Sequence, residues 1–486
     1  MNKEKMLLVA VNAKYVHTNL AVRYISRYCT ENGEMCDFCE HTINEPQGNV
    51  LMQLYAAECD AYGFSCYIWN IRYVLDICKS LKKLRPERKI ILGGPEVSFD
   101  TEDLLEKYDF LDCIICGEGE KAVLEYIRKL SDKRYVIQGT KLDMSELVFP
   151  YTDNDLKAIT ENERLVYYET SRGCPFNCSY CLSSAKQGVD FLNFDRVKKE
   201  LEFLAKSGAI TIKFVDRTFN ADKKRAKEIW KYCMSLETDT CFHFEIGADL
   251  LDDEMLDLLK MAKEGQFQFE IGVQTTNSET IAAVSRTMNL ERLSDNVRKL
   301  RANTNIALHL DLIAGLPYED FESFKKSFNE VYLLSPHVLQ LGFLKLLKGS
   351  GLRNQSNEFG MKFCDNAPYE VFSTDWLTFD DVIKLKAIED VLERFYNSGR
   401  FYETLNVALE CFESPFDFYE KLSIYWAEKG LVGQGVKRIS LYNHLYEFLR
   451  QQLGDEVIKK IMPTLKKDFS RWHSNGVGTP DWYKLY

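Results

Sequence analysis

Three cysteines near the middle of the chain stand in a spacing that constrains both the fold and the chemistry. Cys174, Cys178 and Cys181 form a Cys-x3-Cys-x2-Cys pattern directly after the apolar run Val166–Thr170. Three thiolates in one loop can hold an iron–sulfur cube, and because no fourth cysteine lies nearby, one iron would stay open to a small molecule. The alternative is a zinc site, but such sites generally use four ligands, often as two pairs, and no partner pair is evident nearby.

The cysteine loop begins a regular alternation of apolar runs and helical segments. We expect six strands, at Val166–Thr170, Ile210–Val215, Phe242–Ile246, Phe267–Val273, Ala307–Ile313 and Val338–Phe343. Six strand–helix repeats predict a partial (β/α)6 barrel, in which the chemistry lies at the carboxyl ends of the strands.

The N-terminal part shows the same kind of alternation. The expected strands are Lys5–Val11, Ala61–Ile68, Lys89–Leu92 and Asp112–Cys116, with helices at Asn19–Glu31 and Arg72–Lys83. This pattern predicts a doubly wound, Rossmann- or flavodoxin-like α/β domain, which binds ligands beyond the carboxyl ends of its strands. Two glycine-rich turns, 93–95 and 117–120, fall at such ends, where a ligand approaches the backbone closely.

The predicted domain organisation follows from these patterns. We expect an α/β domain at 1–135, an irregular polar linker at 136–164, the barrel at 165–347 and a mostly helical region at 348–486. Cys36-x2-Cys39 and Cys113-x2-Cys116 lie in expected strands, where positions i and i+3 point to opposite faces, so we interpret them as buried thiols.

Charge and apolar patterning narrow the setting. The formal net charge of -11 argues against a chain held on nucleic acid by bulk electrostatics, although a local basic patch is compatible with it. The apolar run Met6–Val11 is too short for a signal core or a membrane span. We therefore expect a cytoplasmic protein with no membrane partner, whose 15 cysteines are thiols or metal ligands.

The cysteine loop resembles the radical S-adenosylmethionine (SAM) superfamily, because an aromatic residue, Tyr180, precedes the last cysteine and the loop follows a first barrel strand. The resemblance implies that Cys174, Cys178 and Cys181 are the catalytic metal ligands of a 4Fe–4S cluster. SAM would chelate the open iron, and one electron would cleave it to a 5′-deoxyadenosyl radical. Tyr180 matches the position that contacts adenine.

Further barrel residues match the SAM contacts of similar enzymes. Asp216 lies in a segment that resembles the one meeting the SAM amino group, although Arg217 departs from the doubled Asp often found there. Residues matching Glu245, Gln274, Arg286 and Asp311 contact the methionyl carboxylate and the ribose. The chemistry fits, since an arginine can form a bidentate pair with a carboxylate, and acidic side chains accept hydrogen bonds from hydroxyl groups.

The α/β domain ahead of such a barrel, with a helical tail of unassigned role behind it, resembles the cobalamin-binding radical SAM family. The resemblance covers about residues 1–345 and implies corrinoid contacts at strand ends: Asn12, Lys14, Tyr15, His17, Ser65, Tyr67, Gly93, Gly94, Pro95, Glu96, Gly117, Glu118 and Gly119. The chain has no Asp-x-His, the motif whose histidine binds cobalt from below in many cobalamin domains. The lower cobalt ligand therefore stays open. His17 stands near the matching point, and a hydrogen bond at the helix start is its alternative role.

The resemblance implies methyl transfer to an unactivated carbon, with a low-potential electron donor such as flavodoxin or ferredoxin. The substrate class stays open between small molecule, peptide and RNA. Three alternatives remain. One is a radical cyclase or oxidase that uses cobalamin without methyl transfer. Another is a tRNA methylthiotransferase-like enzyme, whose second cluster needs three further cysteines that the N-terminal part does not clearly show. The third is a non-catalytic cobalamin or redox sensor, which the complete set of cluster cysteines disfavours.

Overall fold

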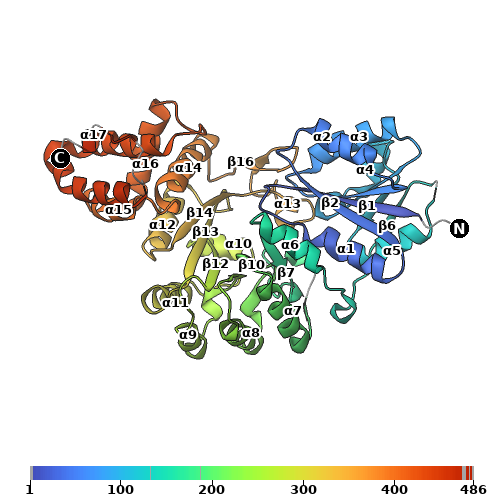
Figure 1. The fold of residues 1–486 in the computed structure, drawn as a ribbon. Helices are drawn as coiled ribbons and strands as arrows, with labels where there is room; N and C mark the ends of the chain where they lie inside the picture. Colours follow the sequence, from blue (N-terminus) through green and yellow to red (C-terminus); the bar gives the residue numbers. More distant parts are fainter. Residues whose placement is uncertain (1–3, 132, 186–187, 473–477, 481, 484–486) are drawn as a thin grey trace.

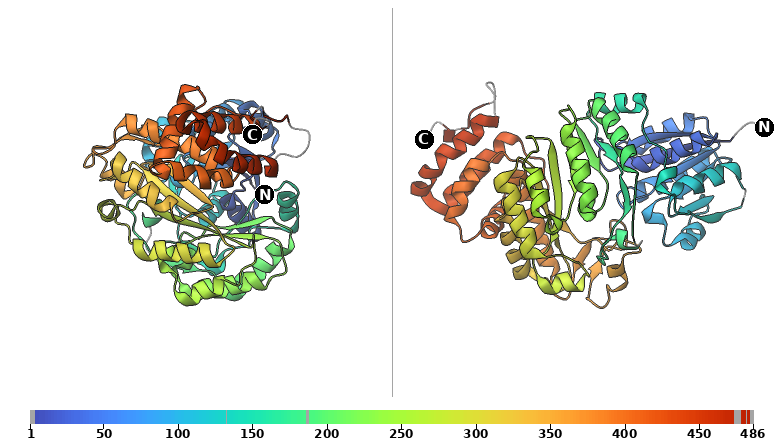
Figure 2. Two further views of the ribbon diagram at one scale, coloured as in Figure 1. Left: turned by 90° about the vertical axis from the view of Figure 1, so that its left-hand side faces the viewer. Right: turned by 90° about the horizontal axis from the view of Figure 1, so that it is seen from below.

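The structure, a computed structural model, describes residues 4–131, 133–185, 188–472, 478–480 and 482–483. An N-terminal α/β domain, a central barrel and a C-terminal helical domain stand in a row, with the two ends of the chain far apart (Figures 1 and 2). No helix in the described ranges is both long and apolar enough to cross a membrane.

The N-terminal domain confirms the predicted doubly wound sheet. Six strands lie in the order β2-β1-β3-β4-β5-β6, and every neighbouring pair is parallel. Their bounds are β1 Lys5–Asn12, β2 Met35–Thr42, β3 Ala61–Ser65, β4 Lys89–Gly93, β5 Cys113–Cys116 and β6 Tyr135–Gln138. β2 extends the strand expected around Cys36 and Cys39, although it mixes charged and apolar residues, whereas the four-residue β6 is not among the expected strands.

Two cores lie on the two faces of this sheet. One face is covered by α1 (Leu20–Glu31) and α5 (Gly119–Arg128), and the other by α2 (Gln47–Ala56), α3 (Ile71–Leu84) and α4 (Thr101–Lys107). Cys36 belongs to the first core and Cys39 packs against the second, as their i, i+3 spacing in a strand predicts. Cys113 and Cys116 divide in the same way, so these pairs are packed thiols on opposite faces.

Residues 136–164, which were expected to form an irregular linker, contain regular secondary structure. Most of β6 lies there and completes the N-terminal sheet, and α6 (Asp153–Glu161) follows. Thr152 and Asp155 form a capping box at the start of α6, in which each side chain accepts a hydrogen bond from the other's backbone. The polar residues that suggested a linker are therefore the helix cap.

The barrel has the six predicted strands. They are β7 Val166–Tyr168, β10 Thr211–Phe214, β11 Cys241–Glu245, β12 Phe267–Gln274, β13 Ala307–Ala314 and β14 Val338–Phe343, parallel and adjacent in that order. The covering helices are α7 Phe194–Lys206, α8 Lys223–Ser235, α9 Asp253–Leu259, α10 Ser278–Ala283, α11 Leu290–Asn303 and α12 Phe321–Tyr332. Phe214, Phe244, Phe269 and Trp230 pack together in the core between strands and helices.

The inner face of the barrel is polar. Strand register places Tyr167, Lys213, His243 and Gln268 in one row across β7, β10, β11 and β12. Glu245, Glu270 and His309 form the next row toward the carboxyl ends of the strands. Closed (β/α)8 barrels fill this space with branched apolar side chains. Here polar side chains that form hydrogen bonds line this space instead, and they continue to the carboxyl ends of the strands.

The C-terminal region is mostly helical, as expected, but it begins with extended chain. α13 (Gly351–Asn354) and the antiparallel strands β15 (Lys362–Phe363) and β16 (Val371–Ser373) lie beside the N-terminal domain (Figure 1). Four helices form the far end: α14 Phe379–Leu392, α15 Tyr402–Ala408, α16 Pro415–Glu428 and α17 Arg438–Trp472.

Candidate active site

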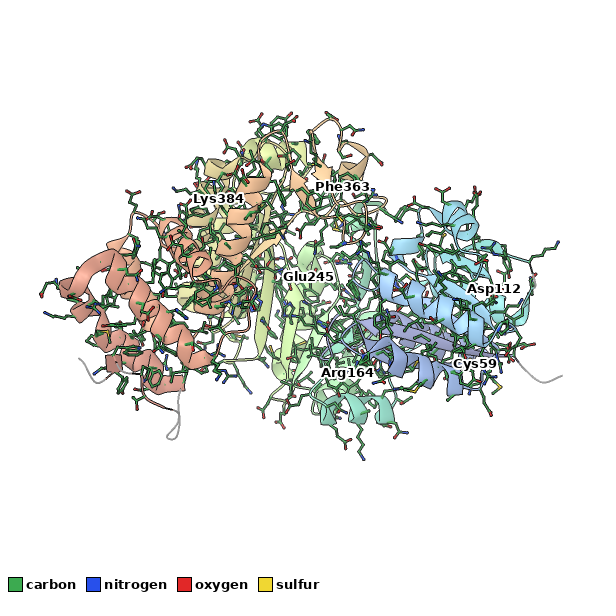
Figure 3. All side chains as sticks on the ribbon, turned by 90° about the horizontal axis from the view of Figure 1, so that it is seen from above. Cys59, Asp112, Arg164, Glu245, Phe363 and Lys384 are labelled. Atoms are coloured by element: carbon green, nitrogen blue, oxygen red, sulfur yellow. The ribbon has the colours of Figure 1, made fainter. Side chains whose placement is uncertain are left out.

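The three cysteines lie in the loop between β8 (Ser171–Gly173) and β9 (Val189–Phe191), a short antiparallel pair. A cavity of about 320 Å³ brings them together with nearly all of the predicted SAM contacts: Tyr180, Glu245, Gln274, Arg286 and Asp311 line the same space. Glu245, labelled in Figure 3, lies in the middle part of the molecule, on the barrel. Residues from four separate barrel segments therefore converge on the cysteine loop.

Arg286 links the cysteine loop to the barrel. Its Nη1 donates to the Tyr180 hydroxyl over 2.8 Å and lies 3.8 Å from the Cys178 Sγ. Its Nη2 donates to the backbone carbonyl of Gly272 in β12. These contacts hold the cation beside the cluster loop, where an anionic group of a ligand would meet it.

A β-bulge aims Gln274 into this cavity. The register of β12 against β13 shifts between Gly272 and Gln274, and Gln274 has φ 72°, a left-handed conformation that costs a non-glycine residue energy. Among the described side chains, Gln274 Oε1, Asp311 Oδ1 and Arg286 Nε are buried atoms that have no protein partner. Buried polar atoms normally have partners, so this cavity fits a polar ligand with donors and acceptors, such as SAM.

The carboxyl groups of the cavity titrate differently. Burial, reinforced by Glu270 and Glu245, raises the pKa of Asp311 to about 7. Burial also raises the pKa of Glu245. The hydrogen bond from His243 and the nearby Lys213 ammonium lower the pKa of Glu270 to about 2. Glu270 is thus the fixed negative charge of the site.

Asp216 does not line the cavity, and its contact with SAM stays a prediction. Its side chain is buried and accepts hydrogen bonds from the Thr170 backbone (3.0 Å), the Thr170 hydroxyl (2.7 Å) and the Ser171 hydroxyl. It therefore anchors the turn between β7 and β8 that leads into the cysteine loop. The next residues, Arg217 and Thr218, line the cavity instead.

Within the described ranges, no three His, Cys, Asp or Glu side chains come close enough together to hold a single metal ion. A 4Fe–4S cube places each cysteine on an iron of its own, so the three thiols surround the cluster rather than one point. The donor set, three thiols without a fourth, fits a cube with one open iron.

A second cavity, of about 480 Å³, lies between the N-terminal domain and the barrel. Asn12, His17 and Tyr67, three of the predicted corrinoid contacts, line it from the N-terminal domain. The barrel supplies Tyr167, Glu169, Arg172 and Val215. The cavity therefore faces the carboxyl ends of both sheets, where ligands of such folds bind.

A narrow third cavity, of about 110 Å³, continues from it along the N-terminal sheet and shares Tyr67 and Ala21 with it. The predicted residues Ser65, Gly93, Gly94, Gly117 and Gly119 line this space. A Cβ atom at Gly63 would stand 2.8 Å from Leu8 Cδ2, and one at Gly119 would stand 2.6 Å from Ile25 Cδ1. Glycine at these two positions thus leaves room for the Leu8 and Ile25 side chains, which also line this narrow slot.

Five predicted corrinoid contacts do not line these cavities. Lys14 and Tyr15 are exposed at the surface, and the Tyr15 hydroxyl donates to Asn162 over 3.0 Å. Pro95 lies in a short turn after β4, and the buried Glu96 accepts a hydrogen bond from Tyr369. Glu118 accepts from the backbone of Leu142 and from Arg172. Tyr15, Glu96 and Glu118 are thus engaged in contacts between chain segments, which sequence alone does not reveal.

The ring of His17 does not cap α1, because Asn19 is the residue that does so. Its Nδ1 lies 2.7 Å from the hydroxyl of Tyr167 on the first barrel strand. Burial, with Lys14, Lys213 and Arg164 nearby, lowers the pKa of His17. A contact of His17 with cobalt stays a prediction.

Several lining residues were missed by the sequence analysis. Trp69 lies at the second cavity, half exposed, and stacks on Tyr67 with 4.3 Å between ring centroids. Arg172 donates to Glu118, Glu120 and Glu169, so one guanidinium joins the cysteine loop to the N-terminal domain. The proximity of Arg172 to Cys174 is a usable signal, but its partners Glu118 and Glu120 lie 54 and 52 residues earlier in the chain.

Comparison with known proteins agrees with this division of the chain. Residues 6–127 match the family model of the B12 binding domain, and 168–331 match that of the radical SAM superfamily. Residues 357–485 match a family described as a protein of unknown function (DUF4080).

Two curated relatives and one solved structure extend the comparison. The cobalamin-dependent radical SAM methyltransferase TokK of Streptomyces tokunonensis is 26% identical over 330 residues, covering 59% of this chain and 47% of TokK. The hopanoid C-3 methylase of Methylococcus capsulatus is 25% identical over 304 residues, covering 58% of each chain. The chain thus spans less than two thirds of the length of these relatives.

The cobalamin-dependent SAM radical enzyme OxsB, solved with aqua-cobalamin and SAM, shares the fold over nearly the whole chain. The TM-score is 0.66 at 15% identity, and the match covers 99% of this chain and 82% of OxsB. The chain therefore carries a B12 binding domain followed by a radical SAM domain, the domain arrangement of the cobalamin-binding radical SAM proteins.

Proposed function

We propose that this protein is a cobalamin-dependent radical SAM enzyme that methylates an unactivated carbon of a polar substrate. The proposal rests on one observation: the two cavities meet at the carboxyl end of the same strand, β10. Val215, directly after β10, lines the cavity toward the N-terminal domain, and Arg217 and Thr218 line the cysteine cavity. A substrate at this strand end would have one cofactor site on each side.

The cysteine cavity supplies what SAM requires. When bound, a reduced 4Fe–4S cluster with SAM supplies the radical, and the corrinoid carries the methyl group. Cys174, Cys178 and Cys181 would hold the cluster. Arg286 would pair with the methionyl carboxylate, while Gln274 and Asp311 would meet donors of the ligand with their unpartnered oxygens.

The glycine-lined slot of the N-terminal domain would hold the corrinoid nucleotide tail, and the cavity above it would hold the ring. The aromatic pair Tyr67 and Trp69 forms part of that wall and would exclude water from the ring. A reductant of low potential is also required, and a flavodoxin or ferredoxin is the expected donor.

The polar inner face of the barrel supports a polar substrate. Lys213 Nζ lies 2.9 Å and His243 Nε2 lies 3.0 Å from the same oxygen of Glu270, one row below the strand ends. A hydrocarbon placed against this row would take these charged groups out of contact with water, which is costly. The methyl acceptor of this enzyme would therefore differ in polarity from the hopanoid named for one of its relatives.

An experiment with labelled SAM tests the proposal without knowledge of the substrate. The full chain, loaded with cluster and cobalamin and reduced, would be given SAM with a deuterated methyl group. We expect a labelled methyl group on the extracted corrinoid and 5′-deoxyadenosine in solution. Cys178→Ser, which would lack the complete cluster, should lose the 5′-deoxyadenosine. Absence of label from the corrinoid of the fully loaded chain would contradict methyl transfer.

A further inference from the structure

The segment 344–373, here named the strap, leaves the barrel after β14 and runs along the N-terminal domain before the C-terminal helices begin (Figure 1). It folds back on itself: the Leu346 N–H donates to the Tyr369 carbonyl over 3.0 Å, and the Val371 N–H donates to the Leu344 carbonyl over 2.9 Å. Residues 357–373 of the strap belong to the family of unknown function.

One side of the strap is built into the N-terminal domain. The Tyr369 hydroxyl donates to the buried carboxylate of Glu96, just after the glycine turn that ends β4. Lys348 lies 3.0 Å from Asp100 and 3.6 Å from the same Glu96. Tyr369 and Ala367 are buried in the core cluster of that domain, with Phe363 packed against it, and Figure 3 labels Phe363 in this region.

The other side of the strap holds the cysteine loop. The Leu352 N–H donates over 2.8 Å to the carbonyl of Ser179, the residue between Cys178 and Tyr180. Leu352, Leu346 and Leu344 share a core cluster against which Tyr180 packs. The strap therefore touches the loop that would carry the cluster through both its backbone and an aromatic side chain.

Arg353 joins the two sides within the strap. Its Nη1 donates to the Leu346 carbonyl over 2.6 Å, and its guanidinium lies 4.6 Å from the centre of the Tyr369 ring. Gly349 has φ 79°, and a Cβ there would overlap the ring of Phe99 in the N-terminal domain. The two contacts are thus connected by a short and internally braced piece of chain.

We infer that the strap is a positioning element that fixes the corrinoid domain relative to the cluster loop, with the pair Tyr369 and Glu96 as its lock. The corrinoid part of this inference rests on the proposed function. The strap thereby gives a role to the first part of the family of unknown function. Without the lock, the strap would no longer couple the turn after β4 to the loop around Ser179.

Two measurements on the full chain test this inference, with Tyr369→Phe as the variant and the exposed Tyr402→Phe as the matched control. The first uses the chain without cofactors. Hydrogen exchange in Tyr369→Phe should be about tenfold faster both at 90–98 and at 176–182, because a lost buried hydrogen bond would loosen both ends. Glu96→Gln, which keeps an acceptor, should give a smaller change. The control should match the wild type.

The second measurement uses pulsed EPR distances between cob(II)alamin and the reduced cluster. The wild type and Tyr402→Phe should give one narrow distance distribution, and Tyr369→Phe a broader one. A narrow distribution in Tyr369→Phe, or faster exchange at 90–98 alone, would overturn the inference. If the wild type retains no corrinoid, the proposed function fails, and the exchange experiment still decides whether the strap couples the two loops.

Discussion

Arg172, two residues before the first cluster cysteine, donates a hydrogen bond over 2.7 Å to Glu120 at the start of a helix in the N-terminal domain. The same guanidinium lies 3.1 Å from Glu118 and 3.1 Å from Glu169. Arg172 is mostly buried among three carboxylates. Its ion pairs therefore connect the barrel to the N-terminal domain.

Removal of that guanidinium should be strongly destabilising. Arg172→Met leaves three neighbouring carboxylates without their cation, and breaking a buried ion pair on one side costs about 3–5 kcal/mol. The free energy of unfolding in urea measures this loss. Arg128→Met removes an exposed ion pair to Glu34, with 2.9 Å between the atoms, and should cost less than about 1 kcal/mol. Equal losses in the two variants would contradict a special role for Arg172.

Cys178→Ser should prevent assembly of a complete cluster. We expect about four irons per reconstituted wild-type chain and less than half of that in the variant, since a hydroxyl is a poor substitute for a thiolate ligand. Iron and sulfide assays on desalted protein give the answer. The exposed Cys411 lies in the C-terminal domain, and Cys411→Ser should retain the full iron content. A full cluster in Cys178→Ser would remove this cysteine from the site.

Gly93→Val should abolish retention of hydroxocobalamin without unfolding the protein. A Cβ at Gly93 meets only Ile115 atoms at 3.7 and 3.8 Å, so the fold accepts a side chain, but the side chain would occupy the slot that Gly93 lines. Absorbance of the corrinoid after desalting measures the effect. Gly435→Val, at a position with open space around its Cβ, is the control. Corrinoid retained by both variants would place the nucleotide tail elsewhere.

Asp311 should make stability depend on pH. Its pKa is raised to about 7 by burial and by Glu270 and Glu245, whereas an unfolded aspartate titrates near 3.9. Between these values the native state binds the extra proton, so the stability contributed by Asp311 is lost as pH rises from about 4 to about 7. Asp311→Asn should therefore gain melting temperature relative to the wild type between about pH 5 and about pH 8.

The control for this prediction is Asp295→Asn, at an exposed position on α11. Its difference from the wild type should be the same at both pH values. A pH-independent difference for Asp311→Asn would show that the Asp311 carboxylate is not desolvated in the native protein.

Local sequence patterns were sufficient for much of the fold. The alternation along 166–343 predicts all six barrel strands, because each strand is an apolar run between helices and its neighbour in the sheet is the next one along the chain. β6 is not predicted, because it is only four residues long and lies at the edge of the sheet. The strap was missed because it owes its shape to contacts with residues such as Glu96 and Ser179.

The site residues also separate into those that local sequence predicts and those that depend on contacts in the folded chain. The cluster cysteines, Arg286 and Gln274 follow fixed positions in the chain relative to strand ends, and the structure brings them into one cavity. Asp216 also follows a strand end, but its neighbours Thr170 and Ser171 capture its carboxylate, which only the folded turn shows. The sequence predicts Glu118 as a ligand contact, because the partner that uses its charge, Arg172, lies in another domain.

The most direct test of this account is SAM cleavage by the fully loaded chain, measured as 5′-deoxyadenosine per chain after reduction, with iron and corrinoid quantified in the same sample. We predict about four irons, one retained corrinoid and 5′-deoxyadenosine formation that Cys178→Ser abolishes. A chain that holds both cofactors and yet forms no 5′-deoxyadenosine under a strong reductant would contradict it and favour a sensor.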